Sequence, residues 1–222
     1  MAEPPATARR ATAAILAKAP IPGFAKTRLI PRLGPEGAAA LHALLLERTA
    51  RAVLAAGFDE AALWCAPDRH APGLDAVRRL PGLALRDQPE GDLGARMRAA
   101  FEAHLAAGPV VLVGTDCPAL GPAELAAARG ALWDGAEVVL VPAEDGGYAA
   151  IGLSRLHPSL FDGVPWGSSA VLAETRARIA RLGWRCRELP PERDVDLPED
   201  LEWLLASGRL TAEERARLAR HL

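Results

Sequence analysis

Three cations lie in a short loop that follows the first apolar run of the sequence. Lys18, Lys26 and Arg28 flank a stretch in which two prolines restrict the backbone and Gly23 allows a close backbone approach; Thr27 belongs to the same loop. Positive charge and exposed amides directly after a strand suit the binding of phosphate groups. The spacing matches neither Gly-x-x-x-x-Gly-Lys-Ser/Thr nor Gly-x-Gly-x-x-Gly, and a solvated basic loop remains the alternative.

A single carboxylate follows the most strongly apolar run, residues 110–113. Asp116 lies in Gly-Thr-Asp-Cys-Pro, where a side chain would be presented to a ligand beyond that strand. One carboxylate with waters and substrate phosphates is the usual way in which proteins hold Mg²⁺. The competing interpretation is that Asp116 caps the next turn. Cys117 is interpreted as a small buried side chain, because no histidine has a sequence context that pairs with it.

Further carboxylates and two glycines occupy residues 144–147. Asp145, Gly146 and Gly147 are typical of a hairpin turn. The same glycines would let a sugar or phosphate approach the backbone beside Asp145. Both interpretations can hold together.

The segment 194–201 supplies the remaining acidic candidates. Asp196 with Glu199 fits the cap of a short helix that has Pro198 in its first turn. That interpretation leaves Asp194 unexplained. The alternative is that Asp194 or Asp196 is a second metal carboxylate facing Asp116 across a cleft.

Weaker candidates lie elsewhere in the chain. Gly94 and Arg96 stand at an expected helix start, where amides and a guanidinium could meet a base or phosphate. Ser168 or Ser169 is expected to cap a helix. The five histidines lack metal-site spacing, and we expect them at the surface.

Apolar runs bounded by Gly and Pro predict the elements that position these residues. Strands are expected at residues 13–17, 61–65, 83–86, 110–113, 137–141, 148–153 and 184–189. Helices are expected at residues 35–56, 92–107, 169–182 and 196–206, after Pro122, and from the capping box of Thr211 and Glu214 onward. This alternation predicts an α/β fold with a mainly parallel sheet and one hairpin. The loops after the first, fourth and fifth strands should then converge on one cleft.

Composition excludes several functional classes. The 222 residues carry 26 Lys and Arg against 28 Asp and Glu, so no broad basic field is available for nucleic acid. No uncharged apolar run approaches the length of a membrane span. The three widely spaced cysteines argue against a disulfide framework or closed zinc site and suit a cytoplasmic location. We expect a disordered tail at residues 1–10 and a single domain at residues 11–222.

Taken in order, these motifs resemble those of the GT-A-type nucleotide-diphospho-sugar transferase superfamily. Within it, the chain looks most like a glycosyltransferase family described beside radical-SAM/selenodomain proteins and arsenosugar biosynthesis. The matching pieces are Ala17-Lys18-Ala19-Pro20, Gly23, Lys26-Thr27-Arg28-Leu29, Gln88, Asp92-Leu93-Gly94-Ala95-Arg96-Met97, Gly114-Thr115-Asp116-Cys117-Pro118-Ala119-Leu120, Asp145-Gly146-Gly147-Tyr148, Trp166-Gly167-Ser168-Ser169 and Asp194-Val195-Asp196-Leu197-Pro198-Glu199-Asp200-Leu201.

The resemblance implies a three-layer α/β/α sandwich with a twisted, mainly parallel sheet. It implies a nucleotide over the first loop and Mg²⁺ or Mn²⁺ at Asp116, with Asp194 and Asp196 as further metal carboxylates. The residues expected to bind the nucleotide are Lys18, Gly23, Lys26, Thr27, Arg28, Gly94, Arg96, Gly146 and Gly147. The superfamily's Asp-x-Asp motif is reduced here to Asp116, which is closer to the related molybdopterin and phospholactate guanylyltransferases.

The expected activity is metal-dependent glycosyl transfer from a nucleotide-diphospho-sugar to a small-molecule acceptor, with Asp116, Lys26 and Asp145 as catalytic residues. The alternative is guanylyltransferase-like transfer from an NTP to a phosphorylated small molecule, with release of pyrophosphate. Residue types do not separate the two, because both need a metal-held diphosphate. A non-enzymatic nucleotide-binding domain is a third interpretation. The terminal helix could pack on its own sheet or on a second copy, which leaves a homodimer open.

Overall fold

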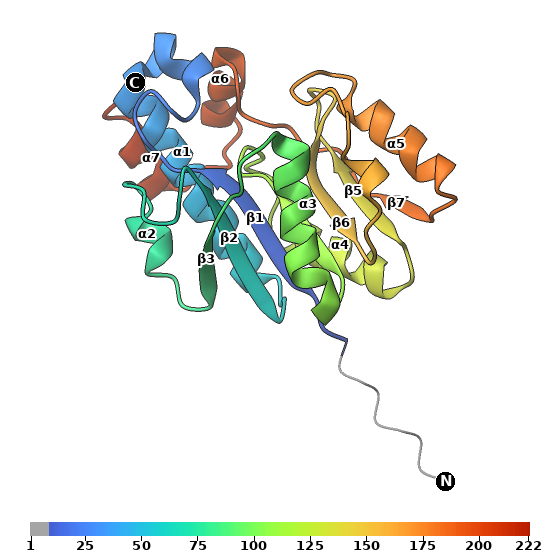
Figure 1. The fold of residues 1–222 in the computed structure, drawn as a ribbon. Coiled ribbons are helices and arrows are strands. Elements are labelled where there is room, and N and C mark those ends of the chain that lie inside the picture. Colours follow the sequence, from blue (N-terminus) through green and yellow to red (C-terminus); the bar gives the residue numbers. More distant parts are fainter. Residues whose placement is uncertain (1–8) are drawn as a thin grey trace.

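The computed structural model describes residues 9–222 of the chain. These residues form one sheet of seven strands with helices around it (Figure 1). The strands are β1 (Thr12–Lys18), β2 (Glu60–Ala66), β3 (Leu83–Asp87), β4 (Val110–Val113), β5 (Val138–Pro142), β6 (Tyr148–Leu153) and β7 (Cys186–Glu188), in the spatial order β3-β2-β1-β4-β6-β5-β7. Strand β6 is antiparallel to β4 and β5, and the other neighbouring pairs are parallel. The mainly parallel sheet and the β5–β6 hairpin are therefore confirmed.

The central strands are apolar on both faces because helices cover both faces of the sheet. Ile15 of β1 pairs with Leu63 on one side and Val113 on the other, and all three side chains are fully buried. A strand in this position has no solvent face, so its sequence shows no polar alternation.

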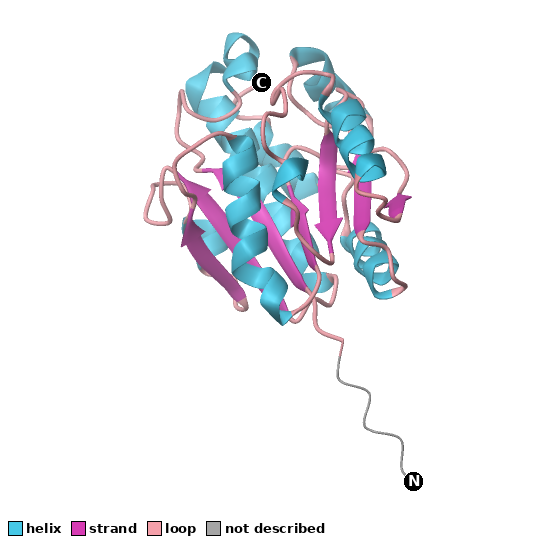
Figure 2. Ribbon diagram, turned by 45° about the vertical axis from the view of Figure 1, so that its right-hand side comes forward, coloured by secondary structure: helices cyan, strands magenta, loops and turns pink. Residues whose placement is uncertain are grey.

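Helices lie on the two faces of the sheet. They are α1 (Ile30–Ala55), α2 (Asp75–Arg78), α3 (Leu93–His104), α4 (Pro122–Trp133), α5 (Val171–Arg181), α6 (Pro198–Ala206) and α7 (Ala212–Leu218), with single 3₁₀ turns at Thr27–Leu29, Leu105–Ala107 and Pro158–Leu160. Helices α1 and α4 pack on one face, and α3 and α5 pack on the other (Figure 2). The three-layer α/β/α sandwich is confirmed.

A separate apolar cluster joins α6 and α7 to the beginning of α1. Leu29, Leu41, Val195, Leu201 and Leu218 are buried in it. The cluster fastens the loop that follows β1 to the loop that precedes α6, although more than 160 residues separate them. Two loops with candidate site residues are thereby held against each other.

The start of α6 differs from the predicted capping box. Leu197 is the N-cap, and the Asp200 carboxylate accepts hydrogen bonds from the amides of Asp196 and Leu197. Asp196 is not the cap because its carboxylate turns to Arg28. The predicted box of Thr211 with Glu214 is confirmed at α7.

Helix α2 was not predicted, and most of the predicted tail lies outside the described residues. Helix α2 is a single turn, too short to show a periodic pattern. Of the predicted tail, residues 1–8 lie outside the described residues, and Arg10 donates a hydrogen bond to Glu60. Across residues 9–222, no helix combines the length and apolar character needed to cross a membrane.

Candidate functional site

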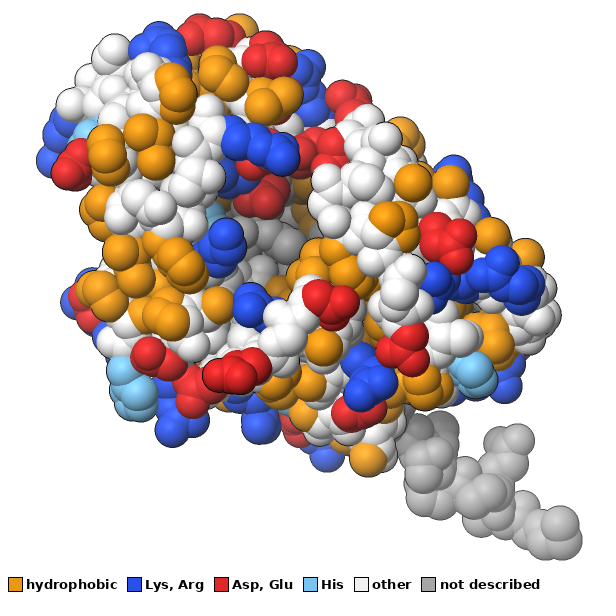
Figure 3. All heavy atoms as spheres, turned by 45° about the horizontal axis from the view of Figure 1, so that its top comes forward, with side chains coloured by type: hydrophobic (Ala, Val, Ile, Leu, Met, Phe, Trp, Pro, Cys, Tyr) orange, Lys and Arg blue, Asp and Glu red, His pale blue; other side chains and the backbone are white. Residues whose placement is uncertain are grey.

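A cavity of about 510 Å³ opens where the parallel strands end. The loops after β1, β4 and β5 all line it, together with residues of the segment before α6, so the predicted convergence is confirmed. Acidic and basic side chains surround the hollow on this face of the molecule (Figure 3).

Lys26 lies at the centre of the polar side of the cavity. Its side chain is only 3% exposed, and Nζ is 2.5 Å from Asp116 Oδ1 and 3.8 Å from Asp196 Oδ1. The same ammonium donates a 2.6 Å hydrogen bond to the carbonyl oxygen of Val195. Lys26 also has a left-handed backbone conformation, with φ at 50°, which no other described non-glycine residue shares. Such strain persists where surrounding contacts fix a side chain in place.

The other cations of the first loop are more accessible. Arg28 is 65% exposed and donates a 2.6 Å hydrogen bond to Asp196 Oδ2. Lys18 lies over the ring of Phe24, with Nζ 5.3 Å from the ring centroid. Lys18 and Lys26 are the chain's only lysines among many arginines, and both line the cavity.

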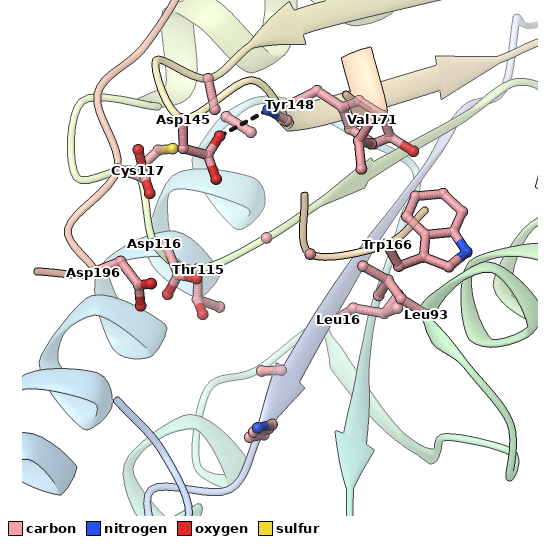
Figure 4. A pocket seen from close by; sticks show the side chains of 18 of the residues that line it. Leu16, Leu93, Thr115, Asp116, Cys117, Asp145, Tyr148, Trp166, Val171 and Asp196 are labelled. Carbon is pink, nitrogen blue, oxygen red and sulfur yellow. Dashed lines mark hydrogen bonds between the residues drawn. The ribbon is translucent and has the colours of Figure 1, made fainter. Parts of the chain in front are cut away.

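Carboxylates from three loops face the same space. Asp116 and Asp145 follow β4 and β5, and Asp196 precedes α6; all three lie together in Figure 4. The Asp116 side chain is 50% exposed, while its backbone oxygen accepts a 2.8 Å hydrogen bond from the amide of Val195. Asp145 Oδ1 accepts a 2.8 Å hydrogen bond from the amide of Gly147 within the hairpin turn.

Asp194 is a fourth carboxylate that lines the cavity. Burial raises its pKa above the ordinary value, and the neighbouring negative charges of Asp145, Asp200 and Asp116 add to the effect. A crowded set of carboxylates of this kind favours the arrival of a cation. Even so, residues 9–222 hold no ready-made cluster of three metal-binding side chains, so Asp116, Asp194 and Asp196 do not form a complete protein cage.

The opposite side of the cavity is apolar. Leu16, Leu93, Tyr148, Trp166 and Val171 line it and lie apart from the carboxylates (Figure 4). We call these five residues the apolar wall. Leu93 is 46% exposed, unusual for a large apolar side chain in this protein.

An aromatic stack supports the apolar wall. Trp166 stacks on Phe161 with ring centroids 6.5 Å apart, and Phe161 stacks on Phe101 of α3 at 5.7 Å. Gly94 leaves the room for this arrangement, because a Cβ there would lie 2.7 Å from Trp166 Nε1 and from the Phe161 carbonyl oxygen. Gly94 is thus a spacer behind the wall.

The predicted nucleotide-binding residues divide into two groups. Lys18, Lys26, Thr27, Arg28 and Gly147 line the cavity, whereas Gly23, Gly94, Arg96 and Gly146 are not among its lining residues. Arg96 donates hydrogen bonds to the Gly91 carbonyl and the Gln88 side chain. Gly146 packs against the backbone of Ser169, and Ser168 accepts a hydrogen bond from Ala170, the N-cap of α5.

The prediction that all five histidines lie at the surface is wrong for two of them. His42 and His104 are each 5% exposed. His42 lines the cavity, its Nε2 is 2.9 Å from the Lys18 carbonyl oxygen, and burial lowers its pKa. Its place on the apolar stripe of α1, four residues after Ala38 and three before Leu45, was the available signal. Cys117 is buried as predicted, and burial raises the pKa of its thiol, which disfavours the thiolate form.

Comparison with solved structures supports the same fold. A protein from Desulfovibrio desulfuricans G20, provisionally assigned as a nucleotide-diphospho-sugar transferase, is 27% identical with a TM-score of 0.85, and the match covers 96% of this chain and 95% of that one. CMP:2-keto-3-deoxy-manno-octonic acid synthetase complexed with CTP is 15% identical, with a TM-score of 0.56 over 96% of this chain and 100% of that one. Rv0371c complexed with manganese, from Mycobacterium tuberculosis H37Rv, is 23% identical, with a TM-score of 0.51 over 89% and 99%.

The last two similarities show the fold alone. No curated protein matches the chain. The family described as an uncharacterized protein conserved in bacteria (DUF2064) matches residues 49–168, a span that includes Asp116 and Asp145. The chain belongs to this family and has the fold of the GT-A-type superfamily of nucleotidyl and sugar transferases.

Proposed function

We propose that this protein is a metal-dependent transferase that takes a nucleotide-diphospho-sugar as donor and moves the sugar to a small-molecule acceptor. One observation carries the proposal: a single cavity has Asp116 and the cations of the first loop on one side and the apolar wall on the other. A donor with a charged diphosphate and a less polar transferred group matches that division.

The first-loop cations would bind the diphosphate. Arg28 and Lys18 are free to turn toward phosphate oxygens, because Arg28 is largely exposed and, within residues 9–222, the Lys18 ammonium contacts only an aromatic ring. Placing them at the departing nucleoside diphosphate stabilises the charge that develops there during transfer. Lys26 is buried and bonded to Val195, so without a donor it holds the Asp116 carboxylate in position.

The donor set fits Mg²⁺ or Mn²⁺ that is partly coordinated by substrate. Asp116 offers a half-exposed carboxylate, and Asp194, which lines the same cavity, would supply a second oxygen ligand. Hard cations of this kind commonly bind one or two protein carboxylates and complete their shell with phosphates and water. When bound, the ion would neutralise the leaving diphosphate. The manganese in Rv0371c accords with such an ion in a protein of the same fold.

The acceptor would lie between the apolar wall and Asp145. Trp166 and Tyr148 give a ring-shaped acceptor or sugar a surface to pack on, and Asp145 lies at the edge of the carboxylate group. We assign Asp145 the orientation of the acceptor hydroxyl, or the acceptance of its proton.

Nucleotidyl transfer from an NTP to a phosphorylated small molecule is the second candidate. It is favoured by the presence of Asp116 without a partner carboxylate two residues away, and by the similarity over almost the whole chain to a synthetase that binds CTP. The same cations would then neutralise departing pyrophosphate.

The released product separates the two candidates. The purified protein is incubated with Mg²⁺ or Mn²⁺ and panels of nucleotide sugars and NTPs, together with small-molecule acceptors, and products are followed by ³¹P NMR. Nucleoside diphosphate released from a sugar donor supports glycosyl transfer, and pyrophosphate released from an NTP supports nucleotidyl transfer. If neither product is released and nucleotides bind equally well without metal, both candidate activities are contradicted. The protein would then be a non-catalytic nucleotide-binding domain.

A further inference from the structure

The charges of the site are already paired within the protein. Lys26 Nζ is 2.5 Å from Asp116 Oδ1, and Arg28 Nη1 is 2.6 Å from Asp196 Oδ2. Lys26 Nζ also lies 3.8 Å from Asp196 Oδ1. Asp196 is therefore within reach of both cations, and each cation has one preferred carboxylate.

The two cations differ in their freedom to move. The Lys26 side chain is 3% exposed and its ammonium is hydrogen-bonded to the Val195 carbonyl, so leaving it without a carboxylate would be costly. A short rotation from Asp116 to Asp196 would keep the ammonium paired and near Val195. Arg28 is 65% exposed and can leave Asp196 at little cost.

A metal ion and the Lys26 ammonium compete for the Asp116 carboxylate. A divalent cation binds a carboxylate oxygen at about 2.1 Å, so the ammonium 2.5 Å from Asp116 Oδ1 obstructs that oxygen by contact and opposes an ion at Oδ2 by like charge. Without a phosphate, the ion would add two positive charges beside Lys26 and Arg28, which already neutralise Asp116 and Asp196. Metal alone should therefore bind poorly.

We propose that donor binding exchanges these ion pairs. The diphosphate draws Arg28 from Asp196, Lys26 turns from Asp116 to Asp196, and Asp116 is released to the metal. The inference rests on the proposed function and deepens it, because it makes the metal–nucleotide complex the ligand that the site accepts. Lys26 and Asp196 act as positioning residues in this exchange, and Asp196 is then not a metal ligand.

Binding of Mn²⁺ without turnover tests the exchange. Electron paramagnetic resonance measures free Mn²⁺ as protein is added, alone and with ADP, GDP, CDP or UDP in turn. Wild-type protein should bind Mn²⁺ weakly alone and at least about tenfold more tightly with the accepted nucleotide. Lys26→Gln should tighten nucleotide-free Mn²⁺ binding by about tenfold or more, because it removes the competing ammonium.

Lys18→Gln is the matched control. The substitution removes the same charge from the same cavity, but the Lys18 side chain contacts Phe24 and not Asp116. The affinity for Mn²⁺ without nucleotide should therefore change by less than about threefold. Equal effects of the two substitutions would show that general electrostatics, and not displacement of Lys26, controls metal binding, and would overturn the exchange.

A measurement on the wild-type protein guards against a Lys26→Gln variant that does not fold. Labelling with ¹⁵N-lysine yields two ammonium groups, and the buried one belongs to Lys26. Its resonance should stay in place with Mg²⁺ alone and shift with Mg²⁺ and the accepted nucleotide together. A shift with Mg²⁺ alone, or none with both, overturns the exchange. If no nucleoside diphosphate promotes Mn²⁺ binding, the proposed function itself fails, which is a separate outcome.

Discussion

The Asp116 carboxylate is in contact with a buried cation and is also exposed to the cavity. One oxygen contacts the Lys26 ammonium, while half of the side chain remains exposed to the cavity. We expect Asp116→Asn to lower turnover by about 10²–10³-fold, because the amide cannot supply the charge that holds a metal-bound diphosphate. The variant should stay folded, since Asn has the same shape and Lys26 keeps its hydrogen bond to Val195 and can turn to Asp196.

Asp75→Asn is the control for this substitution. Asp75 is 71% exposed on α2 and, in the part of the chain that the structure describes, pairs only with Arg78, so its loss should leave both turnover and melting temperature near the wild-type values. Steady-state kinetics and thermal unfolding follow both variants. Turnover of Asp116→Asn close to that of Asp75→Asn would remove Asp116 from the reaction.

The buried histidines predict how stability depends on pH. Burial lowers the pKa of His42 and His104 below the ordinary value of 6.5, so the unfolded chain binds protons that the folded protein does not. The stabilisation is complete above pH 6.5 and is lost as the pH falls toward the lowered values, by at most about 1.4 kcal/mol per pH unit for each histidine.

Melting temperatures between pH 7.5 and 5 check this prediction. The wild-type melting temperature should fall over that range, and the decrease should be smaller in the double variant with His42→Gln and His104→Gln. An identical pH slope in the two proteins would show that other groups control acid stability.

At the level of elements, the start of α3 fixes the apolar wall. Gly94 lies against Trp166 and the Phe161 carbonyl, and any side chain at this position would push them away. Gly94→Ala should cost about 1–3 kcal/mol of unfolding free energy and raise KM for the acceptor through displacement of Trp166.

Gly130→Ala is the matched control on α4. Gly130 is also helical, but a Cβ there meets nothing within 4 Å, so the change should stabilise the protein by up to about 1 kcal/mol. Urea unfolding and acceptor kinetics compare the two alanine variants. Equal stability changes, or an unaltered KM in Gly94→Ala, would contradict the spacer role of Gly94.

Elements with a local signal were predictable from the sequence. The apolar run at residues 110–113 is β4, and the Asp-Gly-Gly turn after residue 144 joins β5 to β6. The stop signals at Gly57 and Gly108 also coincide with element ends, where both glycines have positive φ. The cap of α6 was not predictable, because Asp196 is drawn away by Arg28, a residue 168 positions distant.

At the scale of the whole molecule, chain topology brings the site together. The parallel strands deliver the loops after β1 and β4 to one end of the sheet, which was predictable from the α/β pattern. The sequence did not predict that Lys26 pairs with Asp116, or that both residues are hydrogen-bonded to Val195. These contacts join three loops through tertiary packing, for which the sequence has no local periodicity.

The insertion of β6 between β4 and β5 is also set by tertiary packing and not by a local sequence signal. The hairpin was predictable from its turn, but the side of β6 on which β4 would pair was not. This order brings Asp145 and Tyr148 to the cavity that Asp116 also lines, so the opposition of acidic and apolar sides depends on it.

Anomalous diffraction from crystals grown with Mn²⁺ and a nucleoside diphosphate, with ADP, GDP, CDP and UDP tried in turn, tests the site most directly. The account predicts a manganese peak within about 2.5 Å of the Asp116 carboxylate, with the diphosphate extending toward Arg28 and Lys18. A manganese ion bound away from Asp116, or a nucleotide bound outside this cavity, would contradict it.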